Sequence, residues 1–143
     1  MTKLLLVEDD PGIVKSLTEF LQSEGFLVDS ASGQGSACRL LEEKSYDLVL
    51  LDISLKEGNG FSLCKIIKSE YQIPVIFLTA SSDEYSTVTG FELGADDYIP
   101  KPFRPRELIS RIRSVLRRCG KSQAVVEIEG LRVDTVRAVV TRD

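Results

Sequence analysis

The sequence contains no histidine and no tryptophan, and it has only three cysteines and one methionine among 143 residues. The absence of histidine excludes Ser–His and Cys–His nucleophile pairs as well as metal sites with histidine ligands. Any chemistry must therefore depend on carboxylates, hydroxyls and lysines. Cys38, Cys64 and Cys119 are odd in number and form no Cys-x-x-Cys pair, which is typical of reduced thiols in a cytoplasmic protein.

Long apolar runs are also missing. No run approaches the roughly 18 residues that a membrane-spanning helix needs, and the first residues do not resemble a signal peptide. We therefore expect a cytoplasmic protein without membrane association. The hydrophobic fraction of 43% and the charged fraction of 28% are those of an ordinary globular chain, which argues against disorder.

Acidic and basic residues are distributed unevenly. Residues 1–100 carry 7 basic and 17 acidic side chains, a net charge of −10. Residues 101–121 carry 8 basic side chains and one acidic, a net charge of +7. The net charge of −4 is therefore the sum of a strongly acidic segment and a basic segment that follows it.

Short apolar runs alternate with amphipathic segments along the chain. Runs without polar alternation are typical of strands buried on both faces of a parallel sheet. Five βα units in about 118 residues predict a doubly wound α/β domain with a five-stranded parallel sheet. We expect strands at 3–7, 26–31, 48–51, 75–78 and 97–99, and helices at 11–24, 35–44, 60–69, 82–93 and 104–118.

Polar residues follow these strands where each one ends. Glu8 and Asp9 follow the first strand, Asp52 ends the third, Thr79 the fourth and Lys101 the fifth. Ligand sites of open parallel sheets gather at this carboxyl edge, so the five side chains are expected to meet there. Clustered carboxylates raise each other's pKa unless a cation neutralises them. All-oxygen ligands favour a hard divalent ion, Mg²⁺ first.

Such a site suits phosphoryl chemistry. A carboxylate can hold a phosphoryl group as an acyl phosphate, and the hydroxyl and the ammonium can donate to its oxygens. Each residue also has an ordinary structural interpretation. Glu8 and Asp9 can be loop acids, Asp52 a turn residue, Thr79 a strand threonine and Lys101 a solvated lysine, and Asp10 is best explained as the N-cap of the following helix. The joint pattern favours the site.

The segments LLLVEDD, LVLLDISLKEGNGF, VIFLTA and GADDYIPKPF resemble the signature blocks of response-regulator receiver domains, in order and spacing, across residues 1–118. The resemblance implies a flavodoxin-like fold with strand order 2-1-3-4-5. It also implies that Asp52 is the phosphoacceptor, which receives its phosphoryl group from the phosphohistidine of a sensor histidine kinase. The missing histidine would then be supplied by the partner.

The same resemblance assigns the remaining site residues. Asp9, Asp52 and the backbone carbonyl of Ser54 would bind Mg²⁺ directly, and Glu8 would help through water. Thr79 and Lys101 would bind the phosphate, and the rotamer of Tyr98 would follow Thr79; without the resemblance, Tyr98 is equally a surface aromatic of an edge strand. The peptide bond between Lys101 and Pro102 is expected to be cis.

The end of the chain points to a subfamily. A basic helix, a short polar segment and VEIEGLRVDTVRAVVTRD resemble the OmpR/PhoB regulators, in which a winged-helix DNA-binding domain opens with a small antiparallel sheet. We therefore expect a receiver domain at 1–119, a linker at 120–124 and the start of an effector domain at 125–143. The rest of that domain, which would bind promoter DNA to regulate transcription, would be cut off. The alternative is a stand-alone receiver with a frayed tail.

That subfamily forms homodimers on phosphorylation, through a face that corresponds to residues 82–118. Two departures from the family pattern stand out. Thr87 occupies a position that is usually Lys or Arg, so one bridge between subunits is missing or replaced, and Lys56 replaces a usual proline in the loop after Asp52. The residues that match the pattern of salt bridges between subunits are Asp96, Asp97, Glu107, Arg111 and Arg118.

Two other classes of protein stay open beside the phosphoacceptor. One is a Mg²⁺-dependent aspartyl phosphatase or phosphotransferase, which usually has a second Asp two residues after its nucleophile; Ser54 stands there, so we expect no enzyme. The other is a phosphorylation-independent interaction module, against which the presence of all five site residues argues.

Overall fold

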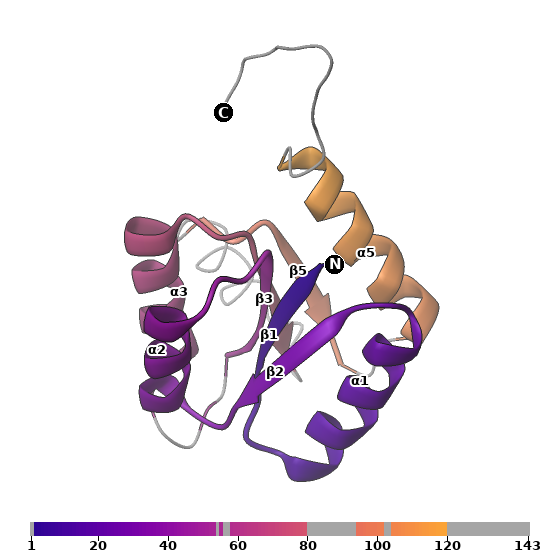
Figure 1. Ribbon diagram of the computed structural model, residues 1–143, viewed down its shortest axis with the longest axis horizontal. Coiled ribbons are helices and arrows are strands. Elements are labelled where there is room, and N and C mark those ends of the chain that lie inside the picture. The colour runs from indigo at the N-terminus through magenta and orange to yellow at the C-terminus, as the bar shows by residue number, and fades with distance from the viewer. Residues whose placement is uncertain (1, 54, 56–57, 80–93, 102–103, 120–143) are drawn as a thin grey trace. The chain divides into compact units, whose positions relative to one another are not determined.

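The computed structural model describes residues 2–53, 55, 58–79, 94–101 and 104–119. Its centre is one five-stranded sheet in the order β2-β1-β3-β4-β5 (Figure 1), and every neighbouring pair of strands is parallel. The expected α/β class and the strand order 2-1-3-4-5 are therefore confirmed. The strands are β1 (Lys3–Val7), β2 (Leu27–Ala31), β3 (Leu48–Asp52), β4 (Val75–Thr79) and β5 (Asp97–Pro100).

The helices follow the expected order. One detail differs from the expectation: the helix predicted over 60–69 changes to a wider π-helical turn, η1, partway along and runs to residue 71. Among the described helices, none is long and apolar enough to cross a membrane. The predicted helix 82–93, the linker 120–124 and the segment 125–143 lie outside the described residues. The described helices are α1 (Pro11–Ser23), α2 (Gln34–Glu43), α3 (Gly60–Ile66), η1 (Ile67–Tyr71) and α5 (Pro105–Arg118).

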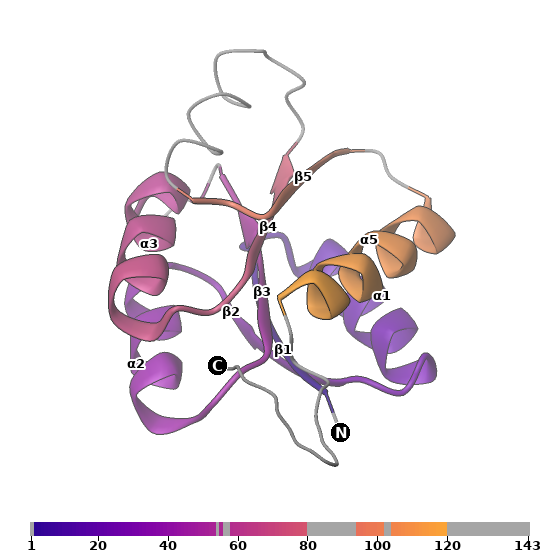
Figure 2. The same ribbon diagram turned by 90° about the horizontal axis from the view of Figure 1, so that it is seen from above.

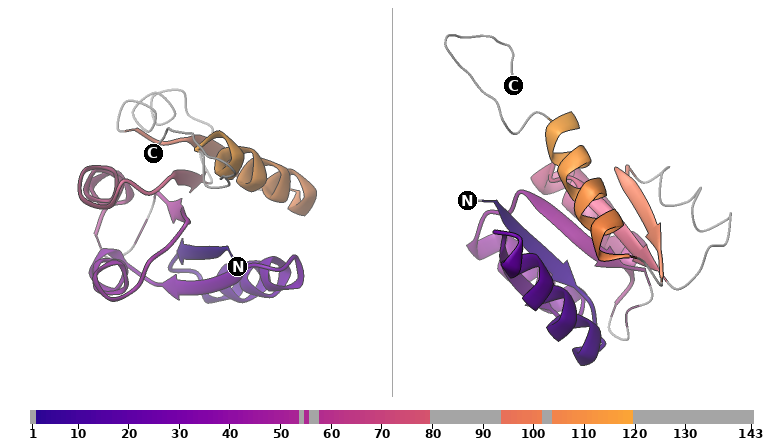
Figure 3. Two further views of the ribbon diagram at one scale, coloured as in Figure 1. Left: turned by 45° about the horizontal axis from the view of Figure 1, so that its top comes forward. Right: turned by 90° about the vertical axis from the view of Figure 1, so that its right-hand side faces the viewer.

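The chain divides into two compact units, residues 1–111 and 112–143, so the division falls within α5. The first unit holds the whole sheet and all of the elements before α5. Within it, α2 and α3 lie on one face of the sheet and α1 lies on the other, as the view from above shows (Figure 2) and the tilted views repeat (Figure 3). The first unit is thus a three-layer sandwich of helix, sheet and helix.

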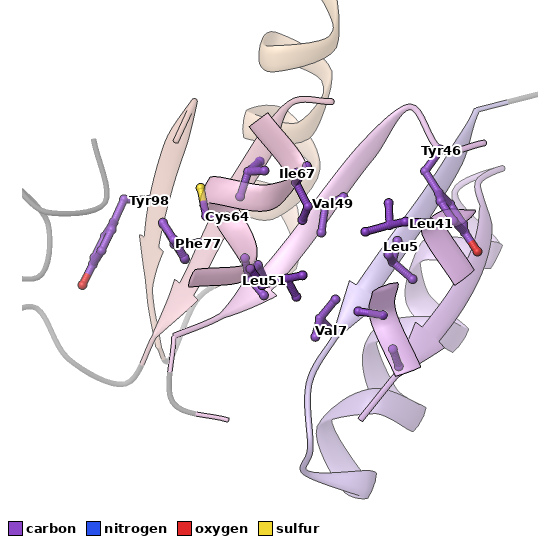
Figure 4. Packing of buried hydrophobic residues seen from close by; sticks show 14 residues of the cluster. Leu5, Val7, Leu41, Tyr46, Val49, Leu51, Cys64, Ile67, Phe77 and Tyr98 are labelled. Carbon is purple, nitrogen blue, oxygen red and sulfur yellow. The ribbon is translucent and has the colours of Figure 1, made fainter. Parts of the chain in front are cut away.

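This layering explains the continuous apolar runs. Every residue from Leu4 to Val7, from Leu48 to Leu51 and from Val75 to Leu78 is fully buried, because side chains alternate between two faces that are both covered. Alternate residues such as Leu5, Val49 and Phe77 pack toward α2 and α3 (Figure 4). Burial of each such side chain contributes about 1.5–3 kcal/mol, so both layers help to hold the strand ends in register.

Two short signals set the ends of α1. The Asp10 carboxylate accepts hydrogen bonds from the backbone N–H of Gly12 at 2.9 Å and of Ile13 at 3.3 Å, which is N-cap geometry. Gly25 has a φ of +95° just after the helix, a conformation that glycine adopts without steric cost. Asp10 is therefore used by the helix, as predicted, and α1 starts directly beside the carboxyl edge of β1.

Candidate functional site

The strand register brings the predicted residues to one edge of the sheet. Val7 of β1 is paired with Leu51 of β3, so the next residues, Glu8 and Asp52, lie side by side. The last pair of β4 and β5 is Thr79 with Pro100, and Lys101 follows directly. Residues that are 93 positions apart therefore meet because four parallel strands end together.

Three carboxylates form a compact cluster there. Glu8, Asp9 and Asp52 each offer one oxygen, and these oxygens lie within 4.8 Å of one another. Glu8 and Asp52 are the two buried charged residues of the described chain, with 1% and 5% of their surface exposed. Oxygen ligands at this spacing fit a hard divalent cation such as Mg²⁺, so the residues present suit the expected metal.

Lys101 supplies positive charge to the cluster. Its Nζ donates to Glu8 Oε1 at 2.7 Å and lies 3.6 Å from Asp52 Oδ2. The lysine side chain is 18% exposed, so the pair is largely shielded from water and from salt screening. A lysine held between two carboxylates neutralises part of their repulsion and lies where it can also donate to a group bound on Asp52.

Burial and pairing shift both partners of this ion pair. Desolvation raises the pKa of the Glu8 carboxyl, although the hydrogen bonds from Lys101 and from the backbone of Asp10 oppose it. Burial alone would lower the pKa of the Lys101 ammonium, but the hydrogen bond to Glu8 and the charge of Asp52 outweigh it and raise the pKa. Lys101 therefore stays charged at neutral pH and acts as the internal counter-ion of the cluster.

Both carboxylate oxygens of Glu8 accept a hydrogen bond. Lys101 donates to Oε1, and the backbone N–H of Asp10 donates to Oε2 at 3.2 Å. The second bond ties Glu8 to the start of α1, so its carboxylate is held in place by two groups of the protein.

Gly60, the first residue of α3, packs against the backbone of Asp52 and Ile53. The N–H of Gly60 donates to the carbonyl of Ile53 at 3.3 Å. A Cβ at Gly60 would lie 2.6 Å from the Asp52 carbonyl oxygen and 2.7 Å from Ile53 Cα, so only glycine allows this approach. The sequence interpretation missed Gly60; its signal was the paired glycines of GNG after the third strand.

The structure describes some of the other expected site residues and not others. The backbone of Thr79 ends β4 at the same edge, whereas Ser54, Lys56 and Pro102 lie outside the described residues. Tyr98 is 8% exposed, and its ring centroid lies 6.5 Å from that of Phe77. The aromatic side chain is thus part of the core, at the end of the cluster beyond Phe77 (Figure 4), and is not an exposed edge residue.

Ion pairs within the chain involve four of the residues expected at a dimer interface: Asp96, Asp97, Glu107 and Arg111. Arg111 contacts Asp97 at 2.9 Å and Glu107 at 3.2 Å. Asp96 accepts from Lys68 at 3.0 Å and from the backbone N–H of Val75 at 2.9 Å. Lys68 is a partner that the sequence interpretation did not name. Arg118 is the last residue of α5 and belongs to the second unit.

Comparison with known proteins gives a consistent result. Residues 4–113 match the family model of the response regulator receiver domain. The chain is 45% identical over 140 residues to the transcriptional regulatory protein GltR of Pseudomonas aeruginosa, an alignment that covers 93% of this chain and 58% of GltR. It is 48% identical over 123 residues to the transcriptional regulatory protein CpxR of Escherichia coli, with 86% of this chain and 53% of CpxR covered.

A solved structure shows the same likeness. The BeF3-activated N-terminal receiver domain of RstA from Klebsiella pneumoniae aligns with a TM-score of 0.78 and 32% identity, covering 81% of this chain and 98% of that one. The chain thus covers almost all of a solved receiver domain. It spans a little more than half of the length of the two curated relatives.

Proposed function

Because this chain belongs to the response regulator receiver family and its relatives are regulators of the OmpR/PhoB type, we propose that Asp52 accepts a phosphoryl group from a sensor histidine kinase. The carboxylate oxygen of Asp52 forms a bond to phosphorus as the bond between phosphorus and the histidine nitrogen of the kinase breaks. The imidazole leaves with the electron pair of that bond. The result is an acyl phosphate on Asp52.

The surrounding residues prepare Asp52 for this step. Mg²⁺, held by Asp9, Asp52 and the Ser54 carbonyl with help from Glu8, would neutralise negative charge on the transferring group. Lys101, already 3.6 Å from Asp52 Oδ2, donates to a phosphate oxygen, and Thr79 supplies a second donor. The position of the Lys101 ammonium is set before the reaction by its ion pair with Glu8, which is the basis of electrostatic preorganisation.

The output would follow from the new charge. The phosphoryl group carries about two negative charges while the Asp52 carboxylate loses its own, so about one further negative charge is added and lies beside the end of β4. Attraction to Thr79 and Lys101 favours a packing of β4 and β5 that differs from the unphosphorylated one. Tyr98 would move with Thr79. The face of residues 82–118 then forms a homodimer in which Asp96, Asp97, Glu107, Arg111 and Arg118 exchange partners between subunits.

The dimer would act through an effector domain. The relatives are transcriptional regulators that are longer than this chain, and residues 125–143 resemble the opening of a winged-helix domain. We place promoter DNA binding in the part of that domain beyond this chain. Dimerisation of the receiver would bring two such domains together, so that they can bind neighbouring half-sites on DNA.

The ion pair of Lys101 with Glu8 beside Asp52 is the observation that best supports this function. It places a cation against a carboxylate cluster that can hold a metal. Beryllofluoride, which mimics a phosphoryl group on aspartate, should bind the wild-type chain in the presence of Mg²⁺ and should leave Asp52→Ala unchanged, as monitored by ¹⁹F NMR. Equal binding by both proteins would contradict the assignment.

The same preparation tests the enzyme alternative. A phosphoacceptor consumes acetyl phosphate in an amount proportional to the amount of protein and then slowly hydrolyses its own acyl phosphate. A phosphatase instead hydrolyses many molecules of a small phosphoester per protein chain. Sustained hydrolysis of p-nitrophenyl phosphate by wild type, abolished in Asp52→Ala, would favour the enzyme.

A further inference from the structure

The first residue of α2 contacts the residues just before α3. Gln34 is the first residue of α2, and its Oε1 accepts a hydrogen bond from the backbone N–H of Asn59 at 3.0 Å. The two residues are 25 positions apart. This bond therefore joins the β2–α2 turn to the loop that follows Asp52.

The contact is close as well as polar. Gly58 has a φ of +91°, and a Cβ at that position would lie 2.4 Å from the Cβ of Gln34. The backbone at Gly58 thus packs directly against the stem of the glutamine side chain. Two independent features, the hydrogen bond to Asn59 and the steric fit at Gly58, hold the loop against Gln34.

The restraint continues from Asn59 to Asp52. The Asn59 side chain caps α3 by accepting from the backbone N–H of Phe61 at 2.7 Å. The next residue, Gly60, donates to the carbonyl of Ile53 and lies against the Asp52 carbonyl. The contacts therefore run from Asn59 through Gly60 to Ile53, the residue that follows Asp52.

We propose that Gln34 is a positioning residue for the phosphoacceptor site, which it serves by fixing Gly58 and Asn59, the two residues before Gly60 and its contact with the Asp52 carbonyl. The inference rests on the proposed function of Asp52. Gln34 touches neither the carboxylate cluster nor Lys101 in the described contacts, so its effect passes through the backbone of Asn59 and Gly60.

The test uses a matched pair of variants in the whole chain. Gln34→Met keeps an unbranched side chain of similar length but removes the acceptor, and Gln34→Glu keeps the acceptor oxygen. The first measurement is Mg²⁺ binding to the unphosphorylated chain by isothermal titration calorimetry. The second is the hydrogen-exchange rate of the Asn59 amide by NMR. If Gln34→Met does not fold, Gln34→Ala replaces it, because alanine also lacks the acceptor.

We expect Gln34→Met to bind Mg²⁺ about three- to tenfold more weakly, which corresponds to the loss of one ordinary hydrogen bond. The Asn59 amide should exchange faster in this variant, and Gln34→Glu should match wild type in both measurements. Since the bond lies at the surface, global stability should change little. A general weakening of the fold would instead lower the melting temperature and would not be rescued by Gln34→Glu.

Two results would overturn the inference: Mg²⁺ affinity of Gln34→Met equal to that of wild type, or an equal loss in Gln34→Met and Gln34→Glu. Asp52→Asn separates this inference from the proposed function. If wild type binds Mg²⁺ and Asp52→Asn does not, failure of the glutamine variants to differ contradicts only the role of Gln34. If wild type and Asp52→Asn bind alike, the proposed metal site itself is wrong.

Discussion

Lys101 Nζ lies 2.7 Å from Glu8 Oε1, and the same nitrogen lies 3.6 Å from Asp52 Oδ2. The end of β5 thus provides the cation that the carboxylates at the ends of β1 and β3 require. A metal that enters the cluster must share these oxygens with the lysine. The same lysine is also placed to donate to a phosphoryl group on Asp52, so its removal should affect the two processes in opposite directions.

Lys101→Met is therefore expected to bind Mg²⁺ more tightly, because a competing positive charge is lost from a buried carboxylate cluster. Phosphorylation by acetyl phosphate should nevertheless be at least about tenfold slower, because the phosphate loses a charged donor. Calorimetry and intact-mass spectrometry measure the two effects. Lys68→Met is the matched control, since Lys68 pairs with Asp96 outside the cluster, and a parallel loss of both properties in Lys101→Met would contradict the account.

Asp9→Asn removes one of three clustered carboxylates. We expect the metal-free chain to become more stable by about 0.5–2 kcal/mol, because like-charge repulsion is relieved, and the stabilisation by Mg²⁺ to disappear. Thermal unfolding with and without Mg²⁺ measures both effects. Asp10→Asn makes the same charge change one residue further on and keeps an N-cap side chain on α1, so it should retain its response to Mg²⁺. An unchanged Mg²⁺ response in Asp9→Asn would exclude Asp9 as a ligand.

Gly60→Ala tests the support behind Asp52. The new Cβ would lie 2.6 Å from the Asp52 carbonyl oxygen, and backbone cannot move away as a side chain does, so we expect a loss of about 2–3 kcal/mol in the free energy of unfolding. Gly12→Ala is the control, because its nearest neighbour is the Asp10 side chain at 3.3 Å and alanine favours a helix. Urea denaturation compares them, and equal stabilities would show that the close approach at Gly60 is not needed.

Tyr46→Phe tests a polar contact at the opposite side of the first unit from the site. The Tyr46 hydroxyl donates to Asp29 Oδ2 at 2.7 Å, which lowers the pKa of the Asp29 carboxyl; the neighbouring Lys44 and Lys3 lower it further. Burial and the same bond raise the pKa of the Tyr46 phenol. We expect the variant to lose about 1 kcal/mol at pH 7, the usual contribution of one hydrogen bond.

The directions of the Asp29 and Tyr46 pKa shifts determine how the stability contributed by this pair depends on pH. Because the pKa of Asp29 is lowered, its contribution to the free energy of unfolding is present above the ordinary pKa of 3.8. This contribution is lost as the pH falls below that value. Because the pKa of the Tyr46 phenol is raised, its contribution to the free energy of unfolding is present below the ordinary pKa of 10.0. This contribution is lost as the pH rises above that value. The stability difference between wild type and Tyr46→Phe should therefore be greatest near neutral pH and shrink toward both extremes. A difference that does not change with pH would contradict the role of this pair.

Local patterns in the sequence were sufficient for much of the fold. The apolar run at Leu48–Leu51 predicted a doubly covered strand, and Asp10 with Pro11 predicted the start of α1, because both depend on near neighbours. The change to π-helical geometry at Ile67 was not predicted. Apolar spacing does not distinguish an α-helix from a π-helical turn when both bury the same side of the segment.

The candidate site was predicted to the extent that it depends on where strands end. Glu8, Asp9 and Asp52 converge because parallel strands end at a common edge. The parts that depend on long-range side-chain contacts were missed. Neither the bond from Gln34 to Asn59 nor the pair of Lys68 with Asp96 follows from a local pattern, since each joins segments whose separation in space is set only by the finished fold.

The most direct test of the central claim is to locate the phosphoryl group by chemistry. The chain is incubated with acetyl phosphate and Mg²⁺ and then reduced with sodium borohydride, which converts an aspartyl phosphate to homoserine, and peptides are sequenced by mass spectrometry. The account predicts homoserine at position 52 and at no other acidic residue. Homoserine at another position, or none in a folded chain that binds Mg²⁺, would contradict it.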